Sequence, residues 1–281
     1  MGSDDYDGFA ARYDAENATS LLNAHYERPA MLALAGDVAG RRILDAGCGS
    51  GPLTAELRAA GAVMTGLDGS SAMIELARRR LGDDVPLHVA DLAEPLPFAD
   101  DAFDDVTASL VLHYLEDWSG PLAEIRRVLR PGGRLIVSVN HPMARTLNCP
   151  QEDYFATRRY LEEVELDGET TTLTMWHRPL TAITRACTAA GFTIAAMDEP
   201  APSPLAPPEL LPRGSSPERG LPSCASSSSS SSPPDPGAAS GIRNDQTSGP
   251  VTDRRDTNVR TTPVTGSGIS SSRASRRRGR E

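Results

Sequence analysis

The stretch Ile43–Gly51 reads ILDAGCGSG and places three glycines directly after a short apolar run. Glycine tolerates positive φ and lets a ligand lie against the main chain, so GxGxG between a strand and a helix predicts a nucleotide-binding loop. Pro52 stands where GxGxxG would have its third glycine. The short motif alone also fits a plain turn or a dinucleotide site, so the identity of the ligand depends on the residues around it.

Strand and helix patterns alternate on both sides of this loop. Short apolar runs predict strands, and apolar residues at helical spacing predict helices. The predicted strands are 42–45, 62–67, 87–89, 103–110, 134–139 and 192–197, and the predicted helices are 17–36, 52–60, 71–81, 121–129 and 180–190. This order predicts an α/β fold of the Rossmann-like, doubly wound type, with a mostly parallel sheet and helices on both faces. Residues 141–178 break the rhythm and are expected to form an inserted hairpin or cap.

Acidic residues stand at three strand ends, and two of them, Asp45 and Asp91, argue against a dinucleotide site. Asp45 precedes the first glycine, where a carboxylate repels a pyrophosphate and attracts a cationic amino-acid head group or a sulfonium. Asp68 follows Gly47 by 21 positions, a spacing that suits a carboxylate accepting from a ribose diol. Asp91 can accept from an exocyclic amino group while the N–H of Leu92 donates to a ring nitrogen, which predicts adenine recognition.

Four segments in order, DAGCGSG, GLDGSSAMIELARRR, VADLAEPLPFADDAFDDVTASLVLHYLEDW and RRVLRPGGRLIVSVNHP, resemble the motifs of class I S-adenosylmethionine (SAM)-dependent methyltransferases. The closest set is the small-molecule group similar to the ubiquinone/menaquinone-biosynthesis methyltransferases, and the resemblance covers roughly residues 6–198. It implies methyl transfer from SAM to an O, N or C atom of a small organic acceptor, with release of S-adenosylhomocysteine (SAH). One departure is Gly69, where the family more often has an apolar residue.

The resemblance also implies which residues hold the cofactor. The amino group of the methionine part would lie on Asp45, the ribose hydroxyls on Asp68, and the adenine on Asp91 and Leu92. Ser109, at the end of the fourth strand, would face the methionine and the sulfonium. The full set implied for cofactor binding is Asp45, Gly47, Cys48, Gly49, Asp68, Gly69, Met73, Asp91, Leu92 and Ser109.

Methyl transfer from a sulfonium needs orientation, a dry site and at most one base. His113 follows the fourth strand and His141 the fifth, at the sheet edge where doubly wound folds bind ligands, so each is a candidate catalytic residue or a structural one. Tyr13 follows Tyr6 and Phe9 near the first helix. In relatives this segment is a lid over SAM, which makes Tyr13 a third candidate, although an ordinary amphipathic helix face fits the same spacing.

Two further side chains have open roles. Trp176, in the inserted region, could form a wall of the acceptor pocket or be a plain core aromatic. Cys48 has no base partner nearby in the sequence, which favours a space-filling role over a nucleophile. The four cysteines show neither CxxC spacing nor a metal pattern, so no metal site is expected.

Composition changes abruptly near residue 200. Pro, Ser, Gly, Thr and Arg dominate residues 200–281, with seven serines at 226–232, and this composition predicts a disordered tail. Relatives close the sheet with a last antiparallel strand, and no such strand is evident after Pro200. We therefore hypothesise that the tail replaces the family's ending, through a reading-frame change or divergence, and leaves strand 192–197 as a bare sheet edge.

Charge divides at the same place. The tail carries 11 Arg and 7 acidic residues, a net charge of +4. Because the whole chain has a net charge of −10, residues 1–199 have a net charge of −14. An acidic domain disfavours a nucleic-acid partner. With neither a leader-like N-terminus nor an apolar run near 18 residues, the chain is expected to be cytoplasmic, off the membrane, and monomeric or homodimeric.

The expected organisation is a helical lid at 1–36, a methyltransferase domain at 37–199 that includes the acceptor-pocket insertion 141–178, and the tail. Two other functions remain open at this point. One is methylation of RNA or protein, and the other is a SAM-fold protein that has lost catalysis and serves as a binding or interaction module.

Overall fold

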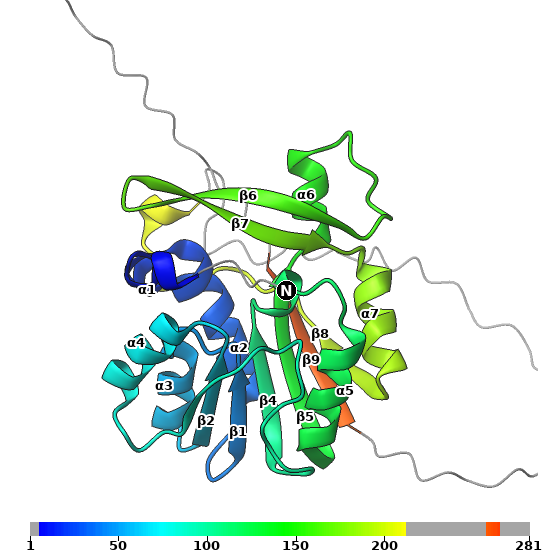
Figure 1. Cartoon of the computed structure of the whole chain (residues 1–281). Coiled ribbons are helices and arrows are strands. Elements are labelled where there is room, and N and C mark those ends of the chain that lie inside the picture. Colours follow the sequence, from blue (N-terminus) through cyan, green and yellow to red (C-terminus); the bar gives the residue numbers. More distant parts are fainter. Residues whose placement is uncertain (1–5, 212–256, 265–281) are drawn as a thin grey trace, which may run out of the picture.

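The central strand β1 (Arg42–Ala46) ends directly at the glycine loop and lies inside a seven-stranded sheet (Figure 1). The computed structural model describes residues 6–211 and 257–264. The strand order is β3-β2-β1-β4-β5-β9-β8, and every pairing in this sheet is parallel. The other strands are β2 (Val63–Asp68), β3 (Leu87–Val89), β4 (Phe103–Ser109), β5 (Leu129–Asn140), β8 (Phe192–Met197) and β9 (Thr257–Val264). The predicted doubly wound α/β class is confirmed.

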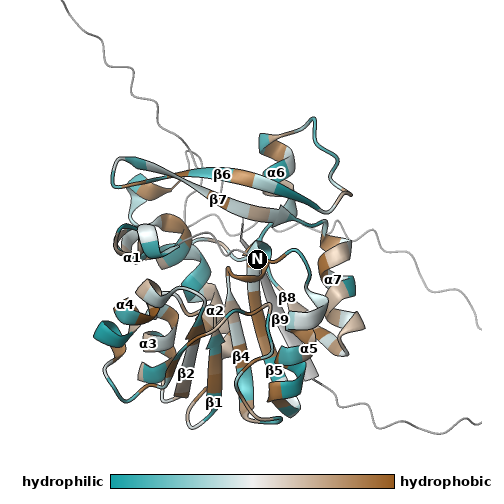
Figure 2. Ribbon diagram, viewed as in Figure 1, coloured by the Kyte–Doolittle hydropathy of each residue, from teal (hydrophilic) through white to brown (hydrophobic). Residues whose placement is uncertain are grey.

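Helices cover both faces of the sheet because successive strand residues point to opposite faces. Ile43 packs into a cluster with α2 (Arg28–Ala35), α3 (Pro52–Ala59) and α4 (Ser71–Leu81). Leu44 packs into the cluster on the other face, which takes in α5 (Ser119–Val128) and α7 (Leu180–Ala189). Figure 2 shows the same division, with apolar strands in the middle of the molecule and polar residues along the outer sides of α3 and α4.

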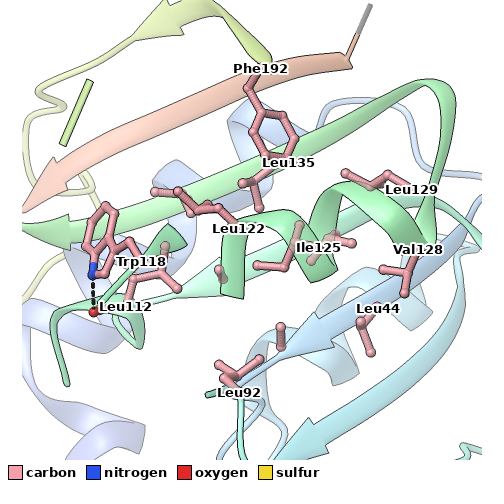
Figure 3. Close-up of a cluster of buried hydrophobic side chains, with 14 of the residues drawn as sticks. Leu44, Leu92, Leu112, Trp118, Leu122, Ile125, Val128, Leu129, Leu135 and Phe192 are labelled. Atoms are coloured by element: carbon pink, nitrogen blue, oxygen red, sulfur yellow. Dashed lines mark hydrogen bonds between the residues drawn. The ribbon is translucent and has the colours of Figure 1, made fainter. Parts of the chain in front are cut away.

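The larger cluster fixes the carboxyl end of β4 against α5. Leu122, Ile125 and Val128 come from one face of α5 at helical spacing and are fully buried (Figure 3). Trp118 lies at the start of this helix, and its indole N–H donates to the carbonyl of Leu112 at 2.7 Å. That bond satisfies a buried polar group and holds the loop after β4 in place.

The termini of α4 match the sequence prediction. The hydroxyl of Ser70 accepts from the N–H of Met73 at 3.1 Å, as an N-cap does, and Gly82 ends the helix at φ +76°. This cap holds the start of α4 beside the end of β2, where the candidate ribose-binding carboxylate lies.

The N-terminal segment departs from the single helix predicted over residues 17–36. It forms a 3-10 turn (Tyr6–Gly8), α1 (Ala10–Thr19), a π-helical turn (Asn23–Glu27) and α2. Ser20 breaks the path because its backbone is extended, with φ −64° and ψ 147°. Apolar spacing did not reveal the break, because Leu21 and Leu22 both lie after Ser20 and the apolar pattern does not extend across it.

The insertion after β5 contains the predicted hairpin. It begins with α6 (Pro142–Asn148) and continues as β6 (Arg158–Leu166) and β7 (Glu169–His177), which pair antiparallel. Asp167 and Gly168 join the strands, both at positive φ (52° and 78°), as a two-residue hairpin turn requires. In Figure 1 this hairpin lies across the carboxyl end of the sheet, above α1.

The strand β9 corrects one expectation. It comes from the tail that was predicted to be disordered and to lack a sheet strand, and it lies between β5 and β8, parallel to both. The sequence Thr257–Val264 is rich in β-branched residues, which favour strands. β8 remains at the sheet edge, as expected. Most of the predicted tail lies outside the described residues, which also include a 3-10 turn, Pro208–Leu210.

No helix of the described residues has the length and apolar character needed to cross a bilayer.

Candidate cofactor and acceptor site

A cavity of about 790 Å³ lies at the carboxyl ends of β1, β2 and β4, in the range usual for small-molecule sites. Doubly wound sheets bind ligands at this edge. Its walls come from the glycine loop, from α1 and the π-helical turn, and from β7. All ten residues implied for cofactor binding line it: Asp45, Gly47, Cys48, Gly49, Asp68, Gly69, Met73, Asp91, Leu92 and Ser109.

The glycine loop lies against the cavity by its main chain. Gly47, Gly49 and Gly51 have φ of +79°, +54° and +82°, a region that disfavours side chains. A Cβ at Gly47 would lie 2.4 Å from Val111 Cγ2. The loop is also tied to the next strand, because the N–H groups of residues 47 and 48 donate to the carbonyl of Leu67 at 2.8 and 2.9 Å.

Asp45 lies at the floor of the cavity and is 1% exposed. Its Oδ2 accepts from the hydroxyl of Thr54 at 2.5 Å, and its Oδ1 accepts from the hydroxyl of Thr107 at 2.8 Å. Burial raises the pKa of this carboxyl above its ordinary value, against the effect of the two hydroxyls. Both oxygens therefore have partners within the protein before any ligand arrives.

Asp68 is placed between the glycine loop and α4. Its Oδ2 accepts from the N–H of Gly49 at 2.8 Å, and its Oδ1 accepts from the N–H of Ser70 at 2.9 Å. A carboxylate has about four acceptor positions, so one remains on each oxygen. Burial raises the pKa of Asp68, and the backbone donors oppose that rise. A ribose diol supplies the two donors that this arrangement can still take.

The adenine end of the predicted site is formed by β3 and the start of α4. Asp91 is exposed at the cavity rim, and its Oδ1 accepts from the N–H of Ala93 at 2.9 Å. Leu92 and Met73 are buried beside it on the cavity wall. An apolar wall next to an exposed carboxylate suits a flat base with one amino group at its edge.

The N-terminal segment is tied to these same loops. Asp7 accepts from the hydroxyl of Ser70 at 2.6 Å and from the N–H of Ala72 at 2.9 Å, at the start of α4. Asp14 accepts from the hydroxyl of Ser50 at 2.5 Å and from Arg80 at 2.8 Å. These hydrogen bonds tie the segment to Ser50 of the glycine loop and to α4 with its cap, an arrangement that agrees with the lid expectation.

The chain matches known proteins over this part. Residues 44–137 match the family model for a methyltransferase domain. A solved structure described as an S-adenosylmethionine-dependent methyltransferase from Listeria monocytogenes superposes with a TM-score of 0.51 at 26% identity, over 64% of this chain and 88% of that one. The chain carries a class I SAM-dependent methyltransferase domain.

Two curated relatives of this methyltransferase domain are named for an activity. A demethylmenaquinone methyltransferase from Clavibacter sepedonicus is 41% identical over 134 residues, which are 47% of this chain and 55% of that protein. A ubiquinone/menaquinone biosynthesis C-methyltransferase from Desulfotalea psychrophila is 34% identical over 154 residues, 53% of this chain and 62% of that protein. The chain thus spans between half and two thirds of the length of these relatives.

The charges on the methyltransferase cavity fit SAM, which carries an ammonium, a sulfonium and a carboxylate. Acidic lining residues outnumber basic ones: Glu27, Asp45, Asp68, Asp91, Glu116 and Asp117 against Arg28 and Arg159. This excess attracts a cofactor with two cationic centres and repels a pyrophosphate. The charge of the cavity lining therefore agrees with SAM rather than with a dinucleotide.

Aromatic side chains close the methyltransferase cavity under the hairpin. Tyr13 lines the cavity, and its ring meets that of Tyr6 edge-on at 5.2 Å. The hydroxyls of Tyr6 and Tyr114 lie 2.5 Å apart, which joins the N-terminal turn to the loop after β4. Burial raises the pKa of Tyr13, so its hydroxyl stays protonated near neutral pH. Tyr13 can thus donate a hydrogen bond but is not poised as a base.

The far end of the cavity is formed by the hairpin. Trp176 and Thr174 of β7 line it together with Arg159 of β6, which pairs with Trp176 across the hairpin. Of the two roles left open for Trp176, the structure places it on the cavity wall. The cavity therefore continues beyond the glycine loop to a region with an indole and a guanidinium.

The two candidate histidines lie outside the cavity lining of the methyltransferase domain. His113 is buried in the core, its Nδ1 has no partner among the described residues, and burial beside Arg178 lowers its pKa to about 3. His141 caps α6, where its Nδ1 accepts from Met143 N–H at 3.1 Å and its Nε2 meets Glu199 at 2.7 Å. Their positions at strand ends predicted cavity access that their side chains do not have.

Cys48 is a buried free thiol on the cavity wall. Burial raises the pKa of this thiol well above its ordinary value, so it is held as the neutral form. A neutral buried thiol fills space and is a poor nucleophile. The structure thus favours the filler interpretation.

Glu27 is among the cavity residues that sequence reasoning missed. It ends the π-helical turn, is 3% exposed, and accepts from the hydroxyls of Ser109 and Ser138. The only local signal is an acidic residue within an apolar helical pattern, which normally indicates a solvent-facing position.

Proposed function

We propose that this chain transfers the methyl group of SAM to an O, N or C atom of a small organic acceptor and releases SAH. One observation carries the proposal: a single cavity joins three strand-end carboxylates, Asp45, Asp68 and Asp91, to a separate aromatic region at Trp176. The region of the cavity with the three carboxylates suits SAM, and the region at Trp176 leaves room for an acceptor.

Bound SAM supplies a methyl group already activated by its sulfonium, so the protein's contribution is orientation and exclusion of water. Asp68 would hold the ribose and Asp91 with Leu92 the adenine, which fixes the cofactor against the glycine loop. Tyr6 and Tyr114 line the same cavity and join the N-terminal turn to the loop after β4.

Residues at the hairpin end would choose the acceptor. Trp176 offers a flat apolar surface, and Arg159 offers a cation beside it. The curated relatives are named for quinone precursors, so ring-bearing acceptors, with demethylmenaquinone among them, are the first to test. No feature of the described residues favours RNA or protein methylation or a non-catalytic role.

The test has two stages. Calorimetric titration of the purified chain with SAH measures cofactor binding, and we expect one site per chain. Isotopically labelled SAM is then incubated with a small-molecule extract and with a panel of ring-bearing acceptors, and mass spectrometry detects labelled products. Failure to bind SAH would refute the proposal, whereas binding without any labelled product would support the non-catalytic alternative.

A further inference from the structure

The π-helical turn before α2 places a carboxylate inside the cavity. Glu27 ends this turn, and the hydroxyl of Ser109 donates to its Oε1 at 2.6 Å and that of Ser138 at 2.5 Å. The two serines come from the carboxyl-terminal parts of β4 and β5. Single π-helical turns occur frequently at functional sites, because the extra residue turns a side chain away from the regular helix face.

In the part of the chain that the structure describes, this carboxylate forms no ion pair. Among the described residues, no basic side chain lies within 4 Å of it, and its Oε2 has no hydrogen-bond partner. Buried charges in proteins are normally paired, since an unpaired one costs several kcal/mol. Burial raises the pKa of Glu27, against the effects of the two serine hydroxyls and of the Arg28 charge. A cationic ligand group would provide a charged partner.

Asp45 is less suited to the same cation. Both of its oxygens already accept threonine hydroxyls, and it is 1% exposed. Its contacts, to Thr54 on α3 and Thr107 on β4, hold the start of the glycine loop against its neighbours. A carboxylate used in this way positions the loop from behind.

Arg28 adds the opposite charge next to Glu27 on the cavity wall. Its guanidinium is held by the side-chain oxygen of Asn17 at 2.5 Å and by Glu56 at 3.6 Å. A neighbouring carboxylate and guanidinium match the two charges of a zwitterionic amino-acid group. A sulfonium has no N–H to donate, so the ammonium is the cation that fits a hydrogen-bonding carboxylate.

We propose that Glu27, rather than Asp45, accepts the hydrogen bond from the ammonium of the amino-acid end of SAM, held in position by Ser109 and Ser138. The proposal rests on the proposed function, because it concerns the same cofactor. It makes Glu27 a binding residue and Asp45 a positioning residue behind the glycine loop.

Three ligands separate this role from a general structural one. SAH carries the ammonium and the carboxylate, its decarboxylated analogue carries the ammonium alone, and 5′-methylthioadenosine carries neither. For Glu27→Gln, we expect affinity for SAH and for the decarboxylated analogue to fall by about 10- to 100-fold, as for a lost charge-assisted bond. Affinity for 5′-methylthioadenosine should stay unchanged. Titration calorimetry measures all three without turnover.

Two further variants complete the design. Glu27→Asp keeps the charge and shortens the side chain by one methylene, so it should show an intermediate loss of affinity for SAH. This variant tests the proposal if Glu27→Gln fails to fold. Glu163→Gln makes the same chemical change at an exposed position of β6 that does not line the cavity, and it should alter none of the affinities. Equal loss for all three ligands, or none for SAH, would overturn the role of Glu27. Absence of SAH binding by the unaltered chain would instead refute the proposed function.

Discussion

Replacing Asp68 by asparagine tests the candidate ribose site with little change in shape. In the structure each carboxylate oxygen takes one backbone N–H, from Gly49 at 2.8 Å and from Ser70 at 2.9 Å. One acceptor position per oxygen remains for the two ribose hydroxyls. The amide keeps one oxygen and turns its NH₂ group toward one of these backbone donors, so the variant loses both the charge and one backbone bond.

The expected loss follows from these bonds. A hydrogen bond to a charged group contributes about 1.5–3 kcal/mol and a neutral one about 0.5–1.5 kcal/mol. One ligand bond is lost, which costs about 1.5–3 kcal/mol, and the other becomes neutral, which costs about 1–1.5 kcal/mol more. Binding of SAH should therefore weaken by about 2.5–4.5 kcal/mol, or roughly 70- to 2,000-fold. The lost backbone bond should lower the free energy of unfolding by about 1 kcal/mol.

Titration calorimetry with SAH gives the affinity, and thermal unfolding without ligand shows whether the fold survives. Asp83→Asn, an exposed change two residues after the end of α4, is the matched control and should bind SAH normally. A 5′-methylthioadenosine analogue lacking both ribose hydroxyls should bind the Asp68→Asn variant as it binds the unaltered chain. If Asp68→Asn binds SAH with full affinity while unfolding at a similar temperature, the ribose assignment is wrong.

Three other changes test separate parts of the structure. His113 is neutral in the fold, with a pKa of about 3, whereas in the unfolded chain the side chain takes up a proton below pH 6.5. The free energy of unfolding should therefore decrease by about 1.4 kcal/mol for each unit that the pH is lowered from 6.5 toward 3. Urea unfolding should show a smaller decrease in His113→Phe. Gly47→Ala should lose about 1–3 kcal/mol of stability and also affinity for SAH, because its Cβ would lie 2.4 Å from Val111 Cγ2. Adding Val111→Ala should restore part of the stability and part of the affinity. If neither recovers, the contact with Val111 is not the source of the strain. A chain ending at residue 211 lacks β9, which pairs with both β5 and β8, so its melting temperature should drop; an unchanged value would contradict that pairing.

Local pattern was sufficient for the elements that carry the glycine loop. The helix 71–81, its cap at Ser70 and its end at Gly82 follow from apolar spacing and from the chemistry of helix termini, and the structure confirms them. The order of strands and helices likewise predicted the parallel sheet, since short crossover helices leave few other arrangements. The cofactor cavity then follows from where parallel strands end.

Non-local packing determined what the pattern missed. Glu27 faces the cavity because its partners lie 82 and 111 residues further along the chain, and no local spacing encodes those contacts. For His113 the sequence left a catalytic and a structural role open, and only the packing of its ring into the core distinguishes them. β9 is separated from its partner strands by a long Pro- and Ser-rich stretch, so composition concealed a short β-branched run.

The acidity of the cavity also explains how one glycine loop could select SAM from other nucleotides. The main chain around Gly47 would accept many ligands that present a flat, polar edge. Glu27 is buried and Asp68 is half-buried, and neither forms an ion pair within the described residues, so a pyrophosphate would add negative charge where two carboxylates already lie. A zwitterion joined to a sulfonium instead brings a net positive charge into the same space. Selection in this site would therefore come from the side chains around the loop, with the loop itself supplying only close approach.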